Sequence, residues 1–135
     1  MVRGSSIGIA CALALLVAAP AASAKTETIL GCGYESDFSS SQKPRSCFLA
    51  WPNLSNAEAA YPRNIKWKHW GHATATATAR HRVKLYDPWT PITLKAFRRK
   101  PCGPGLFVYT RVQVKFPTTT HTWRTPTCAD IHPDD

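Results

Sequence analysis

An alternating run between positions 64 and 86 constrains the fold of this chain more than any other feature. Its odd positions carry mostly apolar or small side chains, and its even positions carry mostly lysine, arginine and threonine. A period of two is typical of a β-strand with one covered and one solvated face. A single strand of this length would span roughly 75 Å, so it must bend, and Gly71 is the expected position. We therefore predict two strands or one sharply bent strand.

Proline and glycine divide the following residues into further short strands. Residues 87–91 are expected to form a turn before a strand at 92–97. A second turn at 99–105 leads into a strand at 106–116, which completes a hairpin. Short strands between such turns, without a credible long helix, indicate an all-β fold. We predict a small antiparallel β-sandwich, with a small barrel as the alternative.

The alternating run places four alanines on its inward side. Alanine fills a β core poorly, so a large side chain or a neighbouring sheet is expected to pack unusually close to it. Trp67 and Trp89 are the candidate fillers.

The first 24 residues have the pattern of a secretory signal peptide. Arg3 precedes an apolar run that ends in small residues, and cleavage is expected after Ala24. The run is too short to anchor the chain in a membrane, so the protein is expected to be secreted. Residues 25–135 would then form a single domain, with a loop-rich part at 25–63, a strand-rich core at 64–116 and a tethered tail at 117–135. A short helical turn is expected within residues 53–60.

The cysteines support export. Cys11 would leave with the leader, and an even set of four remains: Cys32, Cys47, Cys102 and Cys128. Two disulfides are the default in an exported chain. Of the three possible connectivities we favour Cys32–Cys47 with Cys102–Cys128, because near neighbours close loops at least cost. The closely spaced pairs that a structural zinc site needs are absent, and neither a metal nor a cofactor is expected.

Basic residues are concentrated in the middle of the chain. The stretch from 63 to 124 holds thirteen lysines and arginines against one acid, Asp87, which gives a net charge of +12. Such a surface favours anionic partners, although a solvated face that keeps the protein soluble is the simpler alternative.

The outward register places cations beside aromatic rings. Cations bind phosphate or carboxylate, and flat rings stack on bases or sugars, so these residues predict a face for an anionic surface polymer, with nucleic acid included, or for a partner protein. In the alternative interpretation Trp70, Phe107 and Tyr109 cover a second apolar layer. The candidate binding residues are Lys66, Lys68, Trp70, Arg80, Arg82, Lys84, Tyr109 and Arg111.

A binding module is preferred to an enzyme, and no catalytic residue is assigned. No G-x-S-x-G motif occurs in residues 25–135, and carboxylates are scarce in the regular region. A small secreted hydrolase such as a ribonuclease is an alternative, for which Glu58, His121 and Arg111 can be nominated. A secreted inhibitor or toxin-like protein that presents residues 98–105 is another.

Several of these segments resemble a group of small exported bacterial proteins of uncharacterised activity. The resemblance rests on the Trp67-x-x-Trp70-Gly71 strand, the Ala/Thr alternation after it, Cys102-Gly103, and Tyr109-Thr110-Arg111. It covers roughly residues 65 to 115. It implies a secreted β module of bacterial origin and transfers no catalytic or binding residue.

Overall fold

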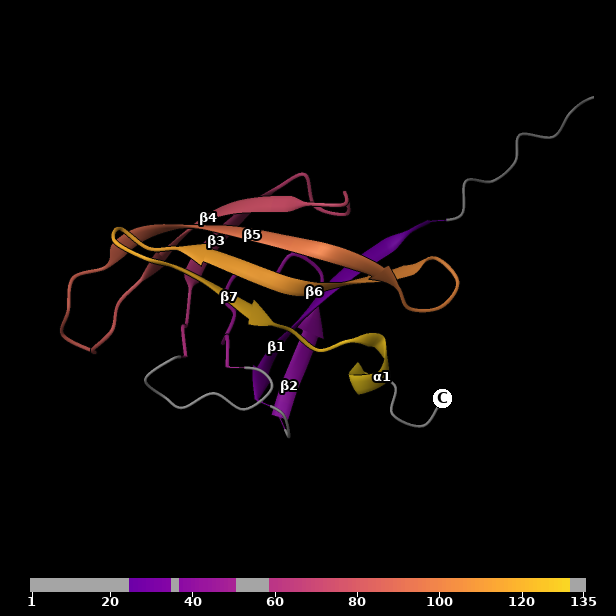
Figure 1. Ribbon diagram of the computed structural model, residues 1–135, viewed down its shortest axis with the longest axis horizontal. Helices are drawn as coiled ribbons and strands as arrows, with labels where there is room; N and C mark the ends of the chain where they lie inside the picture. Colours follow the sequence, from indigo (N-terminus) through magenta and orange to yellow (C-terminus); the bar gives the residue numbers. More distant parts are fainter. Residues whose placement is uncertain (1–24, 35–36, 51–58, 132–135) are drawn as a thin grey trace, which may run out of the picture.

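A computed structural model describes residues 25–34, 37–50 and 59–131, and Figure 1 shows their arrangement. The strands of this part all belong to one sheet, and the all-β class is confirmed. The sheet order is β2-β1-β6-β5-β4-β3, with β7 paired to β6. All pairings are antiparallel except β1 with β6, so the sheet is mixed. The elements are β1 (Glu27–Tyr34), β2 (Asp37–Ser41), β3 (Arg63–Lys68), β4 (Ala75–His81), β5 (Thr90–Pro101), β6 (Leu106–Lys115), β7 (Thr120–Arg124) and α1 (Cys128–Ile131).

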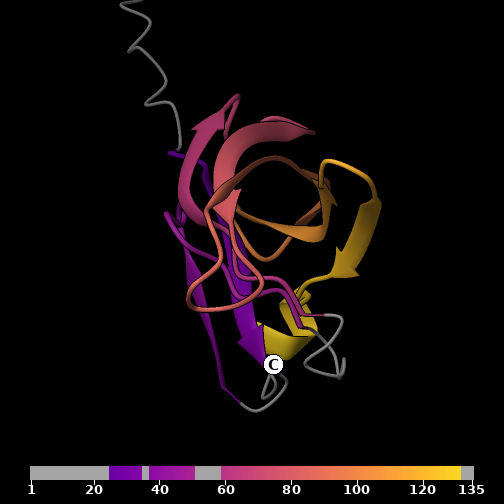
Figure 2. The ribbon, with the colours of Figure 1, turned by 90° about the vertical axis from the view of Figure 1, so that its left-hand side faces the viewer.

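The sheet curls into a half-barrel, which is closer to the barrel alternative than to two facing sheets. Figure 2 shows the strands wrapping around one interior. Segments before β3 line the open side through isolated bridges, in which Leu49 pairs with both Gly33 and Ala60. The curl therefore separates an inner face, which packs the main core, from an outer face.

The predicted alternation is confirmed in β3 and β4. Ile65 is buried between exposed neighbours, and Ala75, Ala77 and Ala79 are buried between exposed residues. The predicted bend is also present, because β3 ends at Lys68 and Gly71 adopts a φ of 86° in the connection.

The continuation of the alternating strand to residue 86 is wrong. β4 ends at His81, which pairs with Thr90, and residues 82–89 form the loop between β4 and β5. A tight turn explains the early end, because Asp87 donates its N–H to the Lys84 carbonyl and accepts the Lys84 N–H on its carboxylate. Val83 and Leu85, expected inside, are exposed.

The main core confirms that large side chains pack against three of the four predicted alanines, whereas Ala73 lies before β4 and is exposed. Ala75, Ala77, Ala79 and Ala96 share one cluster with Tyr109 and Trp123, and Trp67 packs against its edge. Trp89 is not a core filler, because it lies in the β4–β5 loop beneath the Arg82 guanidinium, 4.3 Å from its ring centre.

The prediction of a loop-dominated stretch at 25–63 is wrong for β1 and β2. β1 lies between β2 and β6 and is covered on both faces, so its sequence does not alternate. Leu30 packs in the main core, whereas Ile29 joins Val108 and Cys102 in a second cluster beside α1.

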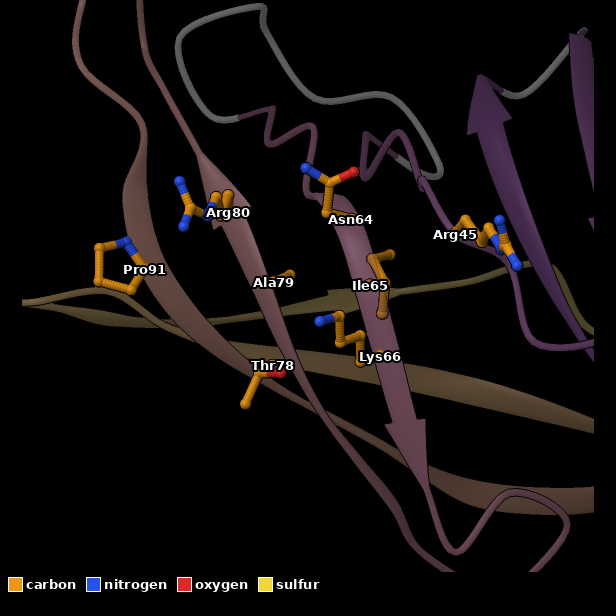
Figure 3. Close-up of a pocket in the computed structure, with 8 residues that line it drawn as sticks. All are labelled: Arg45, Asn64, Ile65, Lys66, Thr78, Ala79, Arg80 and Pro91. Atoms are coloured by element: carbon orange, nitrogen blue, oxygen red, sulfur yellow. The ribbon is translucent and has the colours of Figure 1, made fainter.

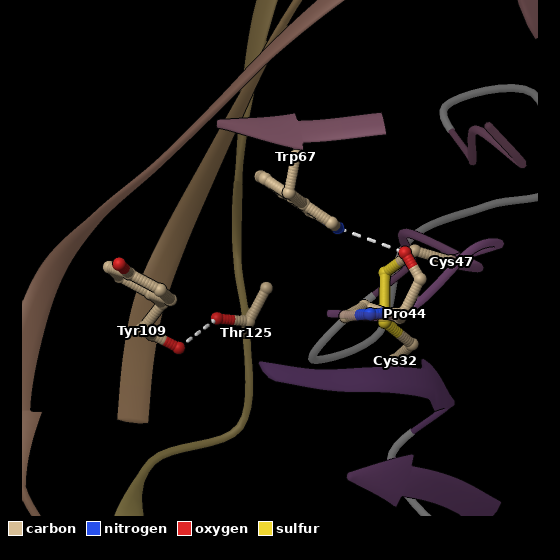
Figure 4. The surroundings of a disulfide bond; sticks show 6 residues. All are labelled: Cys32, Pro44, Cys47, Trp67, Tyr109 and Thr125. Carbon is tan, nitrogen blue, oxygen red and sulfur yellow. Dashed lines mark hydrogen bonds between the residues drawn. A yellow bond between two sulfur atoms is a disulfide. The ribbon is translucent and has the colours of Figure 1, made fainter. Parts of the chain in front are cut away.

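Both predicted disulfides are confirmed. Cys32–Cys47 joins β1 to the segment that closes the half-barrel, with Cα atoms 5.1 Å apart. Beside it, the Trp67 indole donates to the Pro44 carbonyl at 2.9 Å, as Figure 4 shows. Cys102–Cys128 ties α1 to the turn between β5 and β6. In the chain-entropy model each closure contributes about 3 kcal/mol or slightly more.

The tail after residue 117 is more ordered than predicted, because β7 pairs with β6 before the disulfide-tethered α1. The expected leader with its cleavage point at Ala24 lies outside the described residues, as does most of the expected helical turn at 53–60. In the described ranges, no helix has the length and apolarity needed to cross a bilayer.

Candidate functional site

Seven basic residues lie on the outer face of the half-barrel, and we call this set the basic face. They come from five consecutive or neighbouring strands, β3 to β7. Each is separated by an even number of positions from the other outward residues of its strand, as period-two geometry requires. The set comprises Lys66, Lys68, Arg80, Lys95, Arg111, Lys115 and Arg124.

The strand register aligns these cations in rows across the sheet, with threonines between them. Neighbouring strands are about 4.8 Å apart, so Lys68 and Lys95, two strands apart, have backbones roughly 10 Å from each other. This spacing distributes charge along a surface instead of focusing it on one small ion. The two central rows are Lys68–Thr76–Lys95–Gln113–Thr122 and Lys66–Thr78–Thr93–Lys115–Thr120.

The acidic side chains that the structure describes lie elsewhere. Glu27 accepts a hydrogen bond from Gln42, Asp87 closes the β4–β5 turn, and Asp130 accepts bonds from the backbone and hydroxyl of Thr127. None of these three carboxylates lies on the basic face, so the positive charges there have no neutralising partner in this part of the chain.

A cavity of about 790 Å³ opens between β3 and β4 at one edge of the basic face (Figure 3). It exists because the register of the two strands shifts between Arg63 and Lys66, where Asn64 adopts a φ of 52°. Figure 3 shows Lys66 pointing across toward β4. Three cations and two neutral polar side chains line it, so its chemistry suits an anionic oxygen. The lining is Arg45, Asn64, Ile65, Lys66, Thr78, Ala79, Arg80 and Pro91.

A second, smaller hollow of about 410 Å³ continues along the sheet and shares Thr78 with the first. Three lysines, Lys68, Lys95 and Lys115, line it together with threonine and glutamine side chains. The two hollows therefore extend over one connected part of the basic face.

Arg111 stands in a cluster of arginines at the other side of this face. Burial, and then the positive charges of Arg124 and Arg98, lower the pKa of Arg111 below its usual value. Its only hydrogen bond among the described residues goes to the Thr110 carbonyl, at 2.7 Å. A bound anion would relieve this repulsion.

The prediction that Trp70 and Tyr109 belong to the binding face is wrong. Tyr109 is fully buried in the main core, and Trp70 packs against that core and donates its indole N–H to the Thr28 carbonyl at 3.0 Å. Phe107 stacks under Arg99, whose guanidinium carbon lies 3.7 Å from the ring centre. The alternative in which these rings cover an apolar layer describes the structure better.

A local change in backbone conformation explains this error. Arg98 adopts a φ of 50° and accepts the Thr110 hydroxyl on its carbonyl at 2.8 Å. Across this point the inward residues of β6 change from Val112 and Val114 to Tyr109, which a strict period of two would place outside. The sequence gives no clear sign of the change.

Two of the predicted cations also lie away from the basic face. Arg82 and Lys84 belong to the β4–β5 loop, where Arg82 covers Trp89 and Lys84 is exposed. Conversely, Lys95 and Arg124 belong to the face and were not predicted, and Lys115 was predicted to point outward but is not among the candidate binding residues. Phe97 was missed too, and the Lys95 ammonium lies 5.2 Å from its ring centre. The outward register of β5 and β6 indicates the positions of Lys95, Phe97 and Lys115.

The residues nominated for hydrolysis do not form a site. His121 packs with Phe116 and Trp123 toward the inner side, whereas Arg111 is on the outer face, and Glu58 lies outside the described residues. His121 and His81 border a third cavity of about 720 Å³ with Phe116, and none of the described residues that line it is a carboxylate. Residues 98–101 extend β5, so the expected presenting loop is reduced to a tight turn at Cys102–Gly105.

Within the described ranges, no three histidine, cysteine or acidic side chains come together as a metal site. Comparison with known protein families, with curated proteins and with solved structures gives no significant match.

Proposed function

We propose that this chain is an exported bacterial β module that binds an anionic polymer through its basic face. The observation that carries the proposal is the gathering of seven cations from five strands on one sheet face, with none of the described carboxylates among them. The leader-like start of the sequence and the two disulfides support export.

The spacing of the cations favours a polymer over a single small anion. Within the two rows the lysines are two or three strands apart, roughly 10 to 15 Å, which matches charges that repeat along a chain. The threonine hydroxyls between them can donate to phosphate, carboxylate or sugar oxygens. The cavity beside Lys66 and Arg80 gives the surface a hollow in which one anionic group can be held by several donors.

A matched pair of charge reversals tests the proposal. Lys68→Glu with Lys95→Glu changes the basic face, and Lys25→Glu with Lys43→Glu makes the same change in net charge at exposed positions off the sheet face. Binding to long-chain polyphosphate and to polygalacturonate is measured by titration. We expect the first variant to lose affinity about tenfold or more, because two contacts become repulsive, and the second to lose little.

Equal losses in the two variants would show that net charge alone drives retention and would contradict the proposal. Failure of the unmodified protein to bind either polymer would also overturn it and would leave the face to a protein partner. Preference for one polymer would identify phosphate or carboxylate as the natural group.

A further inference from the structure

The β4–β5 loop, residues 82–89, exposes apolar side chains in a way that no other described segment does. Val83 is 81% exposed, Leu85 65% and Tyr86 94%, and among the described residues they are three of the four large hydrophobic side chains that are exposed. Figure 1 shows the loop projecting beyond the left-hand end of the sheet. Apolar groups gathered at a protruding tip mark an interaction surface.

Local contacts hold this tip in shape. The two hydrogen bonds between Lys84 and Asp87, both 3.0 Å long, close the turn. The Arg82 guanidinium stacks on Trp89 at the base of the loop. A defined turn therefore presents these apolar side chains to the solvent.

Cations flank the apolar tip. Arg82 and Lys84 alternate with Val83 and Leu85, and the single acid of the loop, Asp87, has its carboxylate engaged by the Lys84 N–H. Lysine and arginine place their charged ends at the headgroup level of a bilayer while neighbouring apolar groups enter it. Anionic lipids attract each such cation near the surface.

From this arrangement we infer that the β4–β5 loop inserts Val83, Leu85 and Tyr86 into the interface of an anionic lipid bilayer. A protein partner fits less well, because stable protein interfaces take about 800 Å² from each side and three side chains at a tip supply far less. A bilayer needs no complementary shape. The inference concerns a surface different from the basic face, and it would hold if the polymer proposal failed.

The test is co-sedimentation with phosphatidylcholine vesicles, with and without phosphatidylglycerol. The variant replaces Val83, Leu85 and Tyr86 together by serine, which leaves the fold intact because all three side chains are exposed. We expect binding to the anionic vesicles to fall about 100-fold, since each of the three apolar side chains contributes roughly fivefold when it is partly immersed. Tyr61→Ser, at the remaining exposed large hydrophobic, is the matched control and should bind as before.

Two further readouts separate this inference from the polymer proposal. The serine variant should still bind polyphosphate, and Lys68→Glu with Lys95→Glu should keep the part of vesicle binding that resists high salt. Vesicle binding that high salt abolishes completely would assign the interaction to charge alone and overturn insertion. An unmodified protein that binds neither kind of vesicle would overturn it as well and would leave the loop to a protein partner.

Discussion

The Tyr109 hydroxyl ties the turn between β3 and β4 to the middle of β6, and its removal gives a quantitative test of the fold. The hydroxyl donates to the His72 carbonyl at 2.6 Å and accepts the Gly71 N–H at 3.0 Å. The side chain is completely buried, and burial is the main cause that raises its pKa. Tyr109→Phe removes one oxygen and leaves the ring in place.

The magnitude follows from the two lost hydrogen bonds. Each contributes about 0.5 to 1.5 kcal/mol net, and a buried backbone group left without a partner costs about 1 to 3 kcal/mol. The expected loss for Tyr109→Phe is therefore about 2 to 3 kcal/mol in the free energy of unfolding, which corresponds to roughly a 10 °C fall in Tm for a domain of this size.

The assay is urea unfolding, combined with hydrogen exchange at the Gly71 amide. Tyr86→Phe is the matched control, because that side chain is 94% exposed, and its stability should change by less than about 0.5 kcal/mol. The Gly71 amide should exchange faster in Tyr109→Phe than in the control. Equal stability of the two variants, or unchanged protection of Gly71, would refute the assignment of this tie.

Two other perturbations follow from the structure. Burial lowers the pKa of His81, so the unfolded chain binds a proton at this histidine before the folded chain does as the pH falls. The midpoint of urea unfolding should therefore decrease below about pH 6.5, and it should decrease less in His81→Gln. Identical pH profiles of the two proteins would exclude His81 as the group responsible. Gly31→Ala would place a methyl carbon 2.8 Å from Cγ of the buried Pro126; we expect a loss of about 2 kcal/mol in thermal unfolding measurements, and an unchanged Tm would contradict the tight contact.

Much of the sheet could be predicted because burial on one side leaves a period-two record in the sequence. β3 and β4 were predicted from Ile65 and the alternating alanines, and the disulfide pairing followed from loop closure between near neighbours. β1 was missed for the opposite reason, since a strand covered on both faces does not alternate.

The candidate site was predicted in part, and its errors have two physical origins. Lys66, Lys68, Arg80 and Arg111 were placed on the outer face because their neighbours on the same strands are inward. Tyr109 was misplaced because the left-handed Arg98 changes which β6 side chains face the core, and a periodic argument carries no information about such a local backbone change. Arg82 and Lys84 were misplaced because a turn closed by hydrogen bonds ended β4 earlier than the alternation did.

The most direct test of the account is the dependence of polyphosphate affinity on salt concentration. If cations of the basic face each pair with a phosphate, the logarithm of the binding constant falls linearly with the logarithm of salt, with roughly one unit of slope per contact. Lys68→Glu with Lys95→Glu should then make the slope shallower by about two units, and Lys25→Glu with Lys43→Glu should leave it unchanged. An unchanged slope in the first variant, or a shallower one in the second, would contradict a binding surface on this face of the sheet.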